Sequence, residues 1–143
     1  MEEHVVGADD QALQYMLTES HWDSKAVMNQ VAQEANLLLG GDESCLLLDE
    51  SGFEKKGEHS VGVARQWNGR LGKVDNCQVG VFAALGRGSR ATLIDFRLYL
   101  PERWSKEEQR CEKSGIPESC RHFKIKSELS LEMVMQIGRS SFR

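Results

Sequence analysis

The 143-residue sequence has no long hydrophobic run. Its apolar stretches fall well short of the ~20 residues that a membrane-spanning helix requires, so we expect no contact with a membrane. The first residues, Met1 to His4, are acidic and lack the apolar segment of a secretory signal, which predicts a cytoplasmic location. Internal repeats and low-complexity segments are missing as well, which excludes repeat architectures.

Paired cysteines are also lacking. The four cysteines, Cys45, Cys77, Cys111 and Cys120, form no C-x-x-C pair and have no His nearby at zinc-finger spacing. We therefore expect reduced thiols and no zinc site. Cys45 and Cys77 lie in apolar runs, where a free Cys behaves as a small core residue.

What is present suits one folded domain. Hydrophobic residues make up 40% of the chain and charged residues 28%, which is typical of globular proteins. The net charge of −4 is unevenly distributed: residues 1–50 carry eleven acids and one base, whereas residues 51–143 carry eleven acids and seventeen bases. Such asymmetry favours a nucleic-acid-binding surface after residue 50, although an ordinary mixed surface explains it equally well.

Apolar periodicity predicts helices at 9–17 and 25–39, and the second helix ends at Gly40-Gly41. Ser24 is the expected N-cap of the second helix. Residues 1–43 are therefore predicted to form a helical N-terminal segment.

The following residues predict strands and one more helix. The buried strand expected at 45–49 ends where Ser51-Gly52 turns the chain, and further strands are expected near 61–67, 77–85 and 91–100. Short glycine-containing turns join them, which predicts an antiparallel meander. A charged connector then leads to a helix at 125–137, with Ser127 as its cap. The predicted class is α+β.

Asp49 ends the first apolar run and is the first candidate site residue. A carboxylate at the end of a buried strand is held rigidly, and Mg²⁺ in nucleases takes one or two carboxylates together with phosphate oxygens. A solvated strand end explains the same pattern, and the residues alone leave both interpretations open.

Further motifs along the chain favour the metal-binding interpretation of Asp49, because together they resemble a known family. They closely resemble the DDE-type transposases of bacterial insertion sequences, in the branch of the DDE superfamily endonucleases. The matching motifs are DESGF at 49–53, KKG at 55–57, SVGVARQW at 60–67, GK at 72–73, NCQVGV at 76–81, RLYLPERW at 97–104, GIPE at 115–118 and residues 126–134. The resemblance implies that residues 44–143 form the N-terminal half of an RNase H-like catalytic domain.

The same resemblance implies a chemistry. Such transposases use three carboxylates and two metal ions, Mg²⁺ or Mn²⁺, to cleave and join DNA. Asp49 matches the first catalytic aspartate and would be a metal ligand, with Glu50 as a supporting neighbour. The second aspartate is expected on a strand after the last helix, beyond Arg143, and the positions of Asp95, Glu128 and Glu132 do not match it. We therefore expect a truncated transposase with weak or no metal binding and no catalysis by itself.

Five bases follow Asp49 closely and are the candidate DNA-binding residues: Lys55, Lys56, Arg65, Arg70 and Lys73. Lys and Arg neutralise phosphates, so they would hold the ends of the transposon beside the catalytic acid, unless they are only solvated loop charges. The alternative function is a non-catalytic regulator that binds DNA or interacts with full-length transposase, or a remnant.

Overall fold

The structure is a computed structural model that describes residues 9–141, with side chains up to Gly138. Two helices come first, α1 (Asp10–Thr18) and α2 (Ser24–Leu39), followed by the strands β1 (Cys45–Glu54), β2 (Ala64–Asn68), β3 (Lys73–Arg87) and β4 (Arg90–Leu98). The short helices α3 (Glu102–Lys106) and α4 (Glu108–Lys113), the 3-10 turn η2 (Glu118–Cys120) and the helix α5 (Lys126–Ser141) complete the chain. The predicted α+β class is confirmed, and an antiparallel sheet followed by a helix is compatible with a partial RNase H-like fold.

Asp23, rather than the predicted Ser24, caps α2. Its carboxylate accepts hydrogen bonds from the backbone N–H groups of Lys25 and Ala26 at 2.9 and 3.1 Å. The predicted helical segment 1–43 is described from residue 9 on, and its first eight residues lie outside the described range. Its boundary with the rest of the chain stays a prediction. Among residues 9–141, no helix is both long and apolar enough to cross a membrane.

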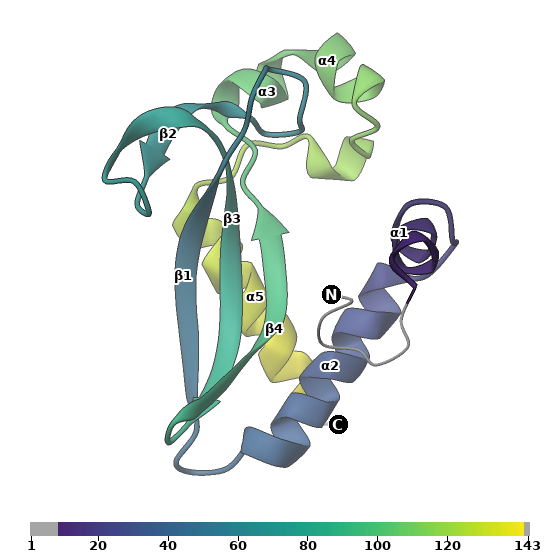
Figure 1. Ribbon diagram of the computed structural model, residues 1–143. Coiled ribbons are helices and arrows are strands. Elements are labelled where there is room, and N and C mark those ends of the chain that lie inside the picture. The colour runs from purple at the N-terminus through teal and green to yellow at the C-terminus, as the bar shows by residue number, and fades with distance from the viewer. Residues whose placement is uncertain (1–8, 142–143) are drawn as a thin grey trace.

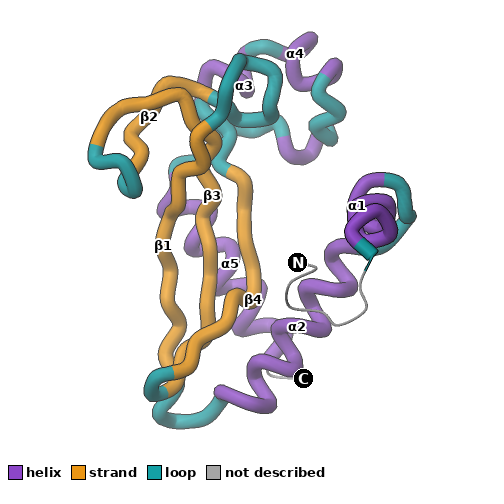
Figure 2. Tube along the Cα trace, viewed as in Figure 1, coloured by secondary structure: helices purple, strands orange, loops and turns teal. Residues whose placement is uncertain are grey.

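β3 is the centre of the sheet, as Figures 1 and 2 show. β1 pairs antiparallel with one side of β3, from Cys77 to Gly86. On the other side, β2 pairs with the first residues of β3 and β4 pairs with its second half. The second edge of β1 has no partner strand within the described residues.

Helices α2 and α5 cover one face of the sheet, which we call the inner face. The core there consists of Ala35, Val81, Ala83, Ile94, Leu129 and Met133. Figure 1 shows α5 behind the strands, with the opposite face, the outer face, towards the viewer. No described helix packs on the outer face, and this leaves Leu47, Leu93 and Phe96 exposed.

The apolar run 45–48 forms a strand, but the expectation that it is buried is wrong. Leu46, Leu47 and Leu48 are all exposed, and Cys45 is exposed too, against the core role expected for it. The reason is position, because β1 is an edge strand. Leu47 lies on the uncovered outer face, whereas Leu46 and Leu48 lie at the margin of the inner face, where α2 and α5 pack mainly on β3 and β4. Cys77 is fully buried, as expected.

A β-bulge interrupts the pairing of β3 with β4 between Ala83 and Ala84. Asp95 lies opposite Ala83, and Leu93 lies opposite Ala84, so Ile94 is the extra residue. Ile94 is buried in the core below α2 and α5. The bulge therefore changes which side chains of β4 reach the inner face.

A second, smaller core lies at the β2 end of the sheet. It joins α3 and α4 to the connection between β1 and β2, and consists of Val63, Leu100, Trp104, Cys111 and Ile116. The indole N–H of Trp104 donates to the carbonyl of Val63 at 2.9 Å. The Arg110 guanidinium lies 3.8 Å from the centre of the Trp104 ring and donates to the carbonyl of Glu58 at 2.7 Å. This core therefore holds the turn that contains Lys55 and Lys56.

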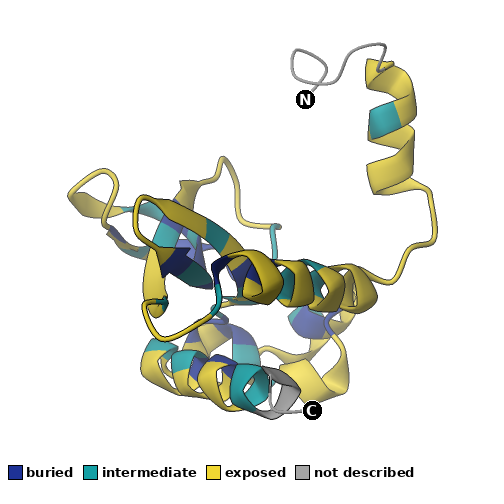
Figure 3. Ribbon diagram, turned by 90° about the horizontal axis from the view of Figure 1, so that it is seen from below, coloured by how far each residue is buried: buried dark blue, intermediate teal, exposed yellow. Residues whose placement is uncertain are grey.

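α1 stands apart from both cores. None of its residues is buried, and Figure 3 shows it almost wholly exposed at the end of α2. The carboxylate of Asp9 caps it through the N–H of Gln11.

Candidate functional site

Asp49 lies in the middle of β1, not at its end. β1 continues to Glu54, so the predicted turn at Ser51-Gly52 is wrong. The backbone of these residues pairs with β3, where Ser51 lies opposite Gly80 and Gly52 opposite Val79. The Asp49 side chain is exposed and accepts a hydrogen bond from the N–H of Glu50 at 2.8 Å.

Asp49 belongs to the outer face. It lies opposite Phe82, which in turn lies opposite Phe96. The Phe82 ring packs between Phe53 and Phe96, with ring centroids 6.1 and 6.3 Å away. Because side chains alternate along a strand, Phe53 shares the face of Asp49. The candidate catalytic acid thus stands beside an exposed aromatic cluster.

Glu50 points to the inner face, opposite to Asp49. Its carboxylate pairs with Lys126 at the start of α5, at 2.8 Å. The Lys126 ammonium also lies 5.3 Å from the centre of the Tyr99 ring. Glu50 therefore ties β1 to α5 and is not beside Asp49 as a second ligand.

The remaining candidate carboxylates have other partners. Asp95 pairs with Arg97 on β4. Glu128 accepts from the N–H of Ile125 at 2.8 Å and closes the first turn of α5, where Ser127 was the expected cap. Glu132 pairs with Lys124 at 2.7 Å.

These residues do not fit a metal ion. In the described part of the chain, no three His, Cys, Asp or Glu side chains converge in a way that could hold one. Mg²⁺ keeps most of its waters unless several oxygen ligands converge, so Asp49 on its own is a poor site. The aspartate is accessible, but the rest of a metal site is not found among residues 9–141.

The five candidate DNA-binding residues lie around the β2 end of the sheet, and the structure separates them. Lys73 pairs with Asp75 at 2.9 Å. This bond raises the pKa of Lys73 and lowers the pKa of Asp75, so both groups stay charged and the lysine is already partly neutralised. Side chains alternate between the faces of a strand, and Asn76 belongs to the outer face. Lys73 and Asp75 therefore lie on the inner face of β3.

The other four bases make no side-chain hydrogen bond or ion pair within residues 9–141. They are Lys55, Lys56, Arg65 and Arg70, and all are exposed. The side-chain amide of Asn76 fixes the turn that holds the two lysines, because it donates to the carbonyls of Lys55 and Gly57 at 2.7 and 2.8 Å. Arg65 lies opposite Asn76 and shares the outer face with Asp49.

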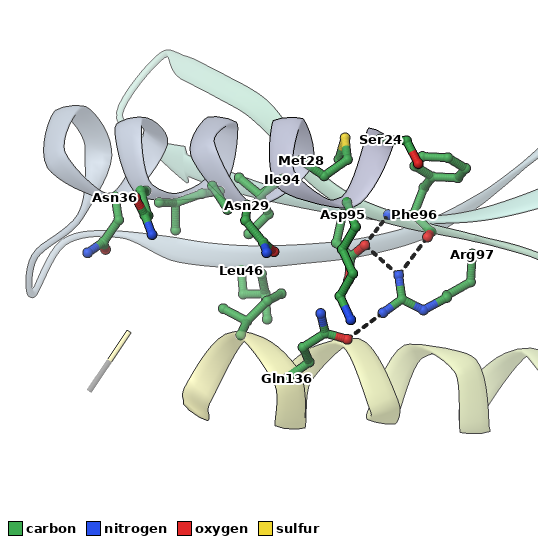
Figure 4. Close-up of a pocket in the computed structure, with 15 residues that line it drawn as sticks. Ser24, Met28, Asn29, Asn36, Leu46, Ile94, Asp95, Phe96, Arg97 and Gln136 are labelled. Atoms are coloured by element: carbon green, nitrogen blue, oxygen red, sulfur yellow. Dashed lines mark hydrogen bonds and ion pairs between the residues drawn. The ribbon is translucent and has the colours of Figure 1, made fainter. Parts of the chain in front are cut away.

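A cavity that the sequence did not indicate lies between α2, α5 and the inner face. Its volume is about 570 Å³, and Leu46, Ile94 and Ile137 contribute to its apolar wall. Figure 4 shows Arg97 between Asp95 and Gln136. Its guanidinium donates a hydrogen bond to the side-chain oxygen of Gln136 at 2.7 Å. The bulge in β4 brings Asp95 to this face, and no local sequence pattern marks a bulge.

The chain is similar to one protein family and to one curated protein. The family described as DDE superfamily endonuclease matches residues 1–143. A protein of Microchaete diplosiphon, named as a probable transposase for insertion sequence element IS701, is 38% identical over 78 residues. That match covers 54% of this chain but only 20% of the relative. No solved structure matches the chain.

Proposed function

The chain belongs to the DDE superfamily endonucleases, and from this premise we propose that it is part of a transposase that cleaves and joins DNA at insertion-sequence ends. The likeness to the IS701 transposase supports the proposal. Because the chain spans about a fifth of that relative's length, the activity, the DNA ends and the partners of a whole transposase are proposals for this chain.

Asp49 is the residue on which this function depends. The observation that carries the proposal is its position, exposed on an uncovered sheet face without an ion pair in the described structure. Endonucleases of this family generally depend on divalent metal ions. Asp49 would contribute the first carboxylate, and residues 9–141 bring no two further His, Cys, Asp or Glu ligands to it.

A second candidate function follows from the same geometry. No described cluster of three ligands accompanies Asp49, which favours a chain that binds DNA without cutting it. Such a chain would occupy transposon ends or pair with a complete transposase as a regulator. Cleavage by the purified chain separates the two candidates.

Four exposed bases carry the proposed contact with DNA. Lys55, Lys56, Arg65 and Arg70 make no ion pair within residues 9–141, so their charges remain available to phosphates. Lys73 would contribute less, because Asp75 already neutralises it. Contacts with the phosphate backbone carry little sequence information, so the ends would be recognised by other residues.

The test is a salt titration of DNA binding by the 143-residue chain. Lys55→Ala/Lys56→Ala should weaken binding to unrelated duplexes equally and reduce the slope of log K against log salt by about one per lost contact. Lys25→Ala/Arg90→Ala is the matched control, since it removes the same charge from α2 and from the start of β4 at the far end of the sheet. Equal slopes for the unaltered chain and both double variants would show that the lysines of the basic turn are solvated and do not contact DNA.

The same preparations test catalysis. With Mg²⁺ or Mn²⁺ present, we expect no nicking of supercoiled DNA, because one carboxylate holds the ion poorly. Nicking that is lost in Asp49→Asn would instead identify a complete enzyme and remove the non-catalytic candidate.

A further inference from the structure

Trp67 on β2 is an exposed aromatic residue that the fold does not use. The residue is 55% exposed, and its ring makes no ring contact within residues 9–141. It lies opposite Val74, which is also exposed. Because alternate residues of a strand share a face, Trp67 lies on the outer face together with Arg65.

The charges at this end of the sheet are sorted between its two faces. Arg65 lies opposite Asn76, and the N–H of Lys55 bonds to the carbonyl of the same Asn76 at 3.0 Å, so both bases flank it on the outer face. The neighbouring acids Glu54 and Asp75 alternate with these residues and point to the other side. The surface around Trp67 is therefore positive and carries a free ring.

The strand that presents Trp67 is held in place before any ligand arrives. The side-chain amide of Gln66 donates to the carbonyl of Cys77 at 2.9 Å. The carbonyl oxygen of the buried Asn68 side chain accepts from the N–H of Arg70 at 3.1 Å. A ring on a rigid strand binds a flat partner without first being ordered.

We propose that Trp67, Arg65 and Lys55 form a binding site for an unpaired DNA strand, with a base stacked on Trp67 and phosphates held by the two cations. An exposed aromatic ring within a basic surface is the arrangement by which single strands are bound without sequence preference. The proposal rests on the proposed function, since it takes DNA as the partner.

The strand register limits the distance between this site and Asp49. Val74, opposite Trp67, and Phe82, opposite Asp49, are eight residues apart on β3. At about 3.4 Å per residue the two sites are at most about 27 Å apart along the strand. A stacked strand advances about 3.4 Å per nucleotide, so the stacked base would lie at most about eight nucleotides from the phosphate at Asp49.

The experiment compares single-stranded and duplex DNA of the same sequence, about 16 nucleotides long, by fluorescence anisotropy with the 143-residue chain. Trp67→Ala should weaken single-strand binding about tenfold and leave duplex binding within about twofold, whereas Trp67→Phe should restore most of the loss. Arg65→Ala should weaken both. Trp22→Ala is the matched control, because Trp22 is also half exposed but lies between α1 and α2.

The possible outcomes are distinct. Equal loss for both DNA forms, or no loss, would overturn the stacking site and leave the proposed function standing. Failure of the unaltered chain to bind either DNA form would overturn both proposals. Self-association of the chain that Trp67→Ala abolishes would show that the ring contacts protein instead. Thermal unfolding of each variant confirms that the fold persists.

Discussion

Burial divides the four thiols into two accessible and two protected groups. Cys45 and Cys120 are exposed, whereas Cys77 and Cys111 are fully buried. Burial also raises the pKa of the Cys77 thiol, so less of the reactive thiolate forms there. We predict that a thiol reagent at about pH 8 modifies two thiols quickly in the folded chain and four in denaturant.

The control is Cys45→Ser/Cys120→Ser, which should show no fast phase while folded. Fast modification of three or more thiols in the unaltered chain would contradict the packing of Cys77 and Cys111. The sequence predicted Cys77 correctly because it lies in a central strand, but failed for Cys45. An apolar run identifies a strand without showing whether anything covers it.

Among the elements, β1 depends on a glycine that the sequence presents as a turn residue. A Cβ on Gly52 would lie 2.7 Å from Cγ of Asn68, whose side chain is buried. The glycine therefore lets two strands approach closely. Gly52→Ala should lower the free energy of unfolding by about 1–3 kcal/mol in a denaturant titration, because Asn68 or the strand must shift.

Gly69→Ala is the matched control, since no atom lies within 4 Å of its added Cβ and its φ is not positive. Asn68→Ala should cost stability alone but cost less when combined with Gly52→Ala, because the clash is then removed. Additive losses in the double variant would contradict a direct contact between the two residues.

The order of the elements was predictable from the sequence, and their detailed ends were not. Periodicity predicted the helices and strands, including α1, although none of the residues of α1 is buried. Ser51-Gly52 was wrongly predicted to be a turn. Gly52 instead makes room for the Asn68 side chain, and this contact between distant residues cannot be read from the local sequence. The cap at Asp23 and the bulge before Asp95 likewise depend on backbone geometry that composition does not specify. Asp49 was identified as a site residue through motifs, whereas Trp67 required the strand register.

For the whole molecule, the edge of β1 that no strand of residues 9–141 covers favours association with other chains. An edge strand with exposed Leu46, Leu47 and Leu48 offers both backbone groups and apolar side chains to another chain. We predict association that grows with concentration in sedimentation experiments. Leu47→Lys should reduce it, and Leu37→Lys on the exposed part of α2 should not. A monomer at every concentration, or equal effects of both changes, would contradict this.

The anchoring of the basic turn has a consequence for synthesis of the chain. The carbonyl of Glu58 is held by Arg110, 52 residues later, and the carbonyl of Val63 by Trp104, 41 residues later. At about 5–20 residues per second, a ribosome adds Arg110 about 3 to 10 seconds after Glu58. During that interval Asn76 is already available to the carbonyls of Lys55 and Gly57, but the carbonyls of Glu58 and Val63 lack their partners. The connection between β1 and β2 therefore gains its last anchors only when translation has passed α4.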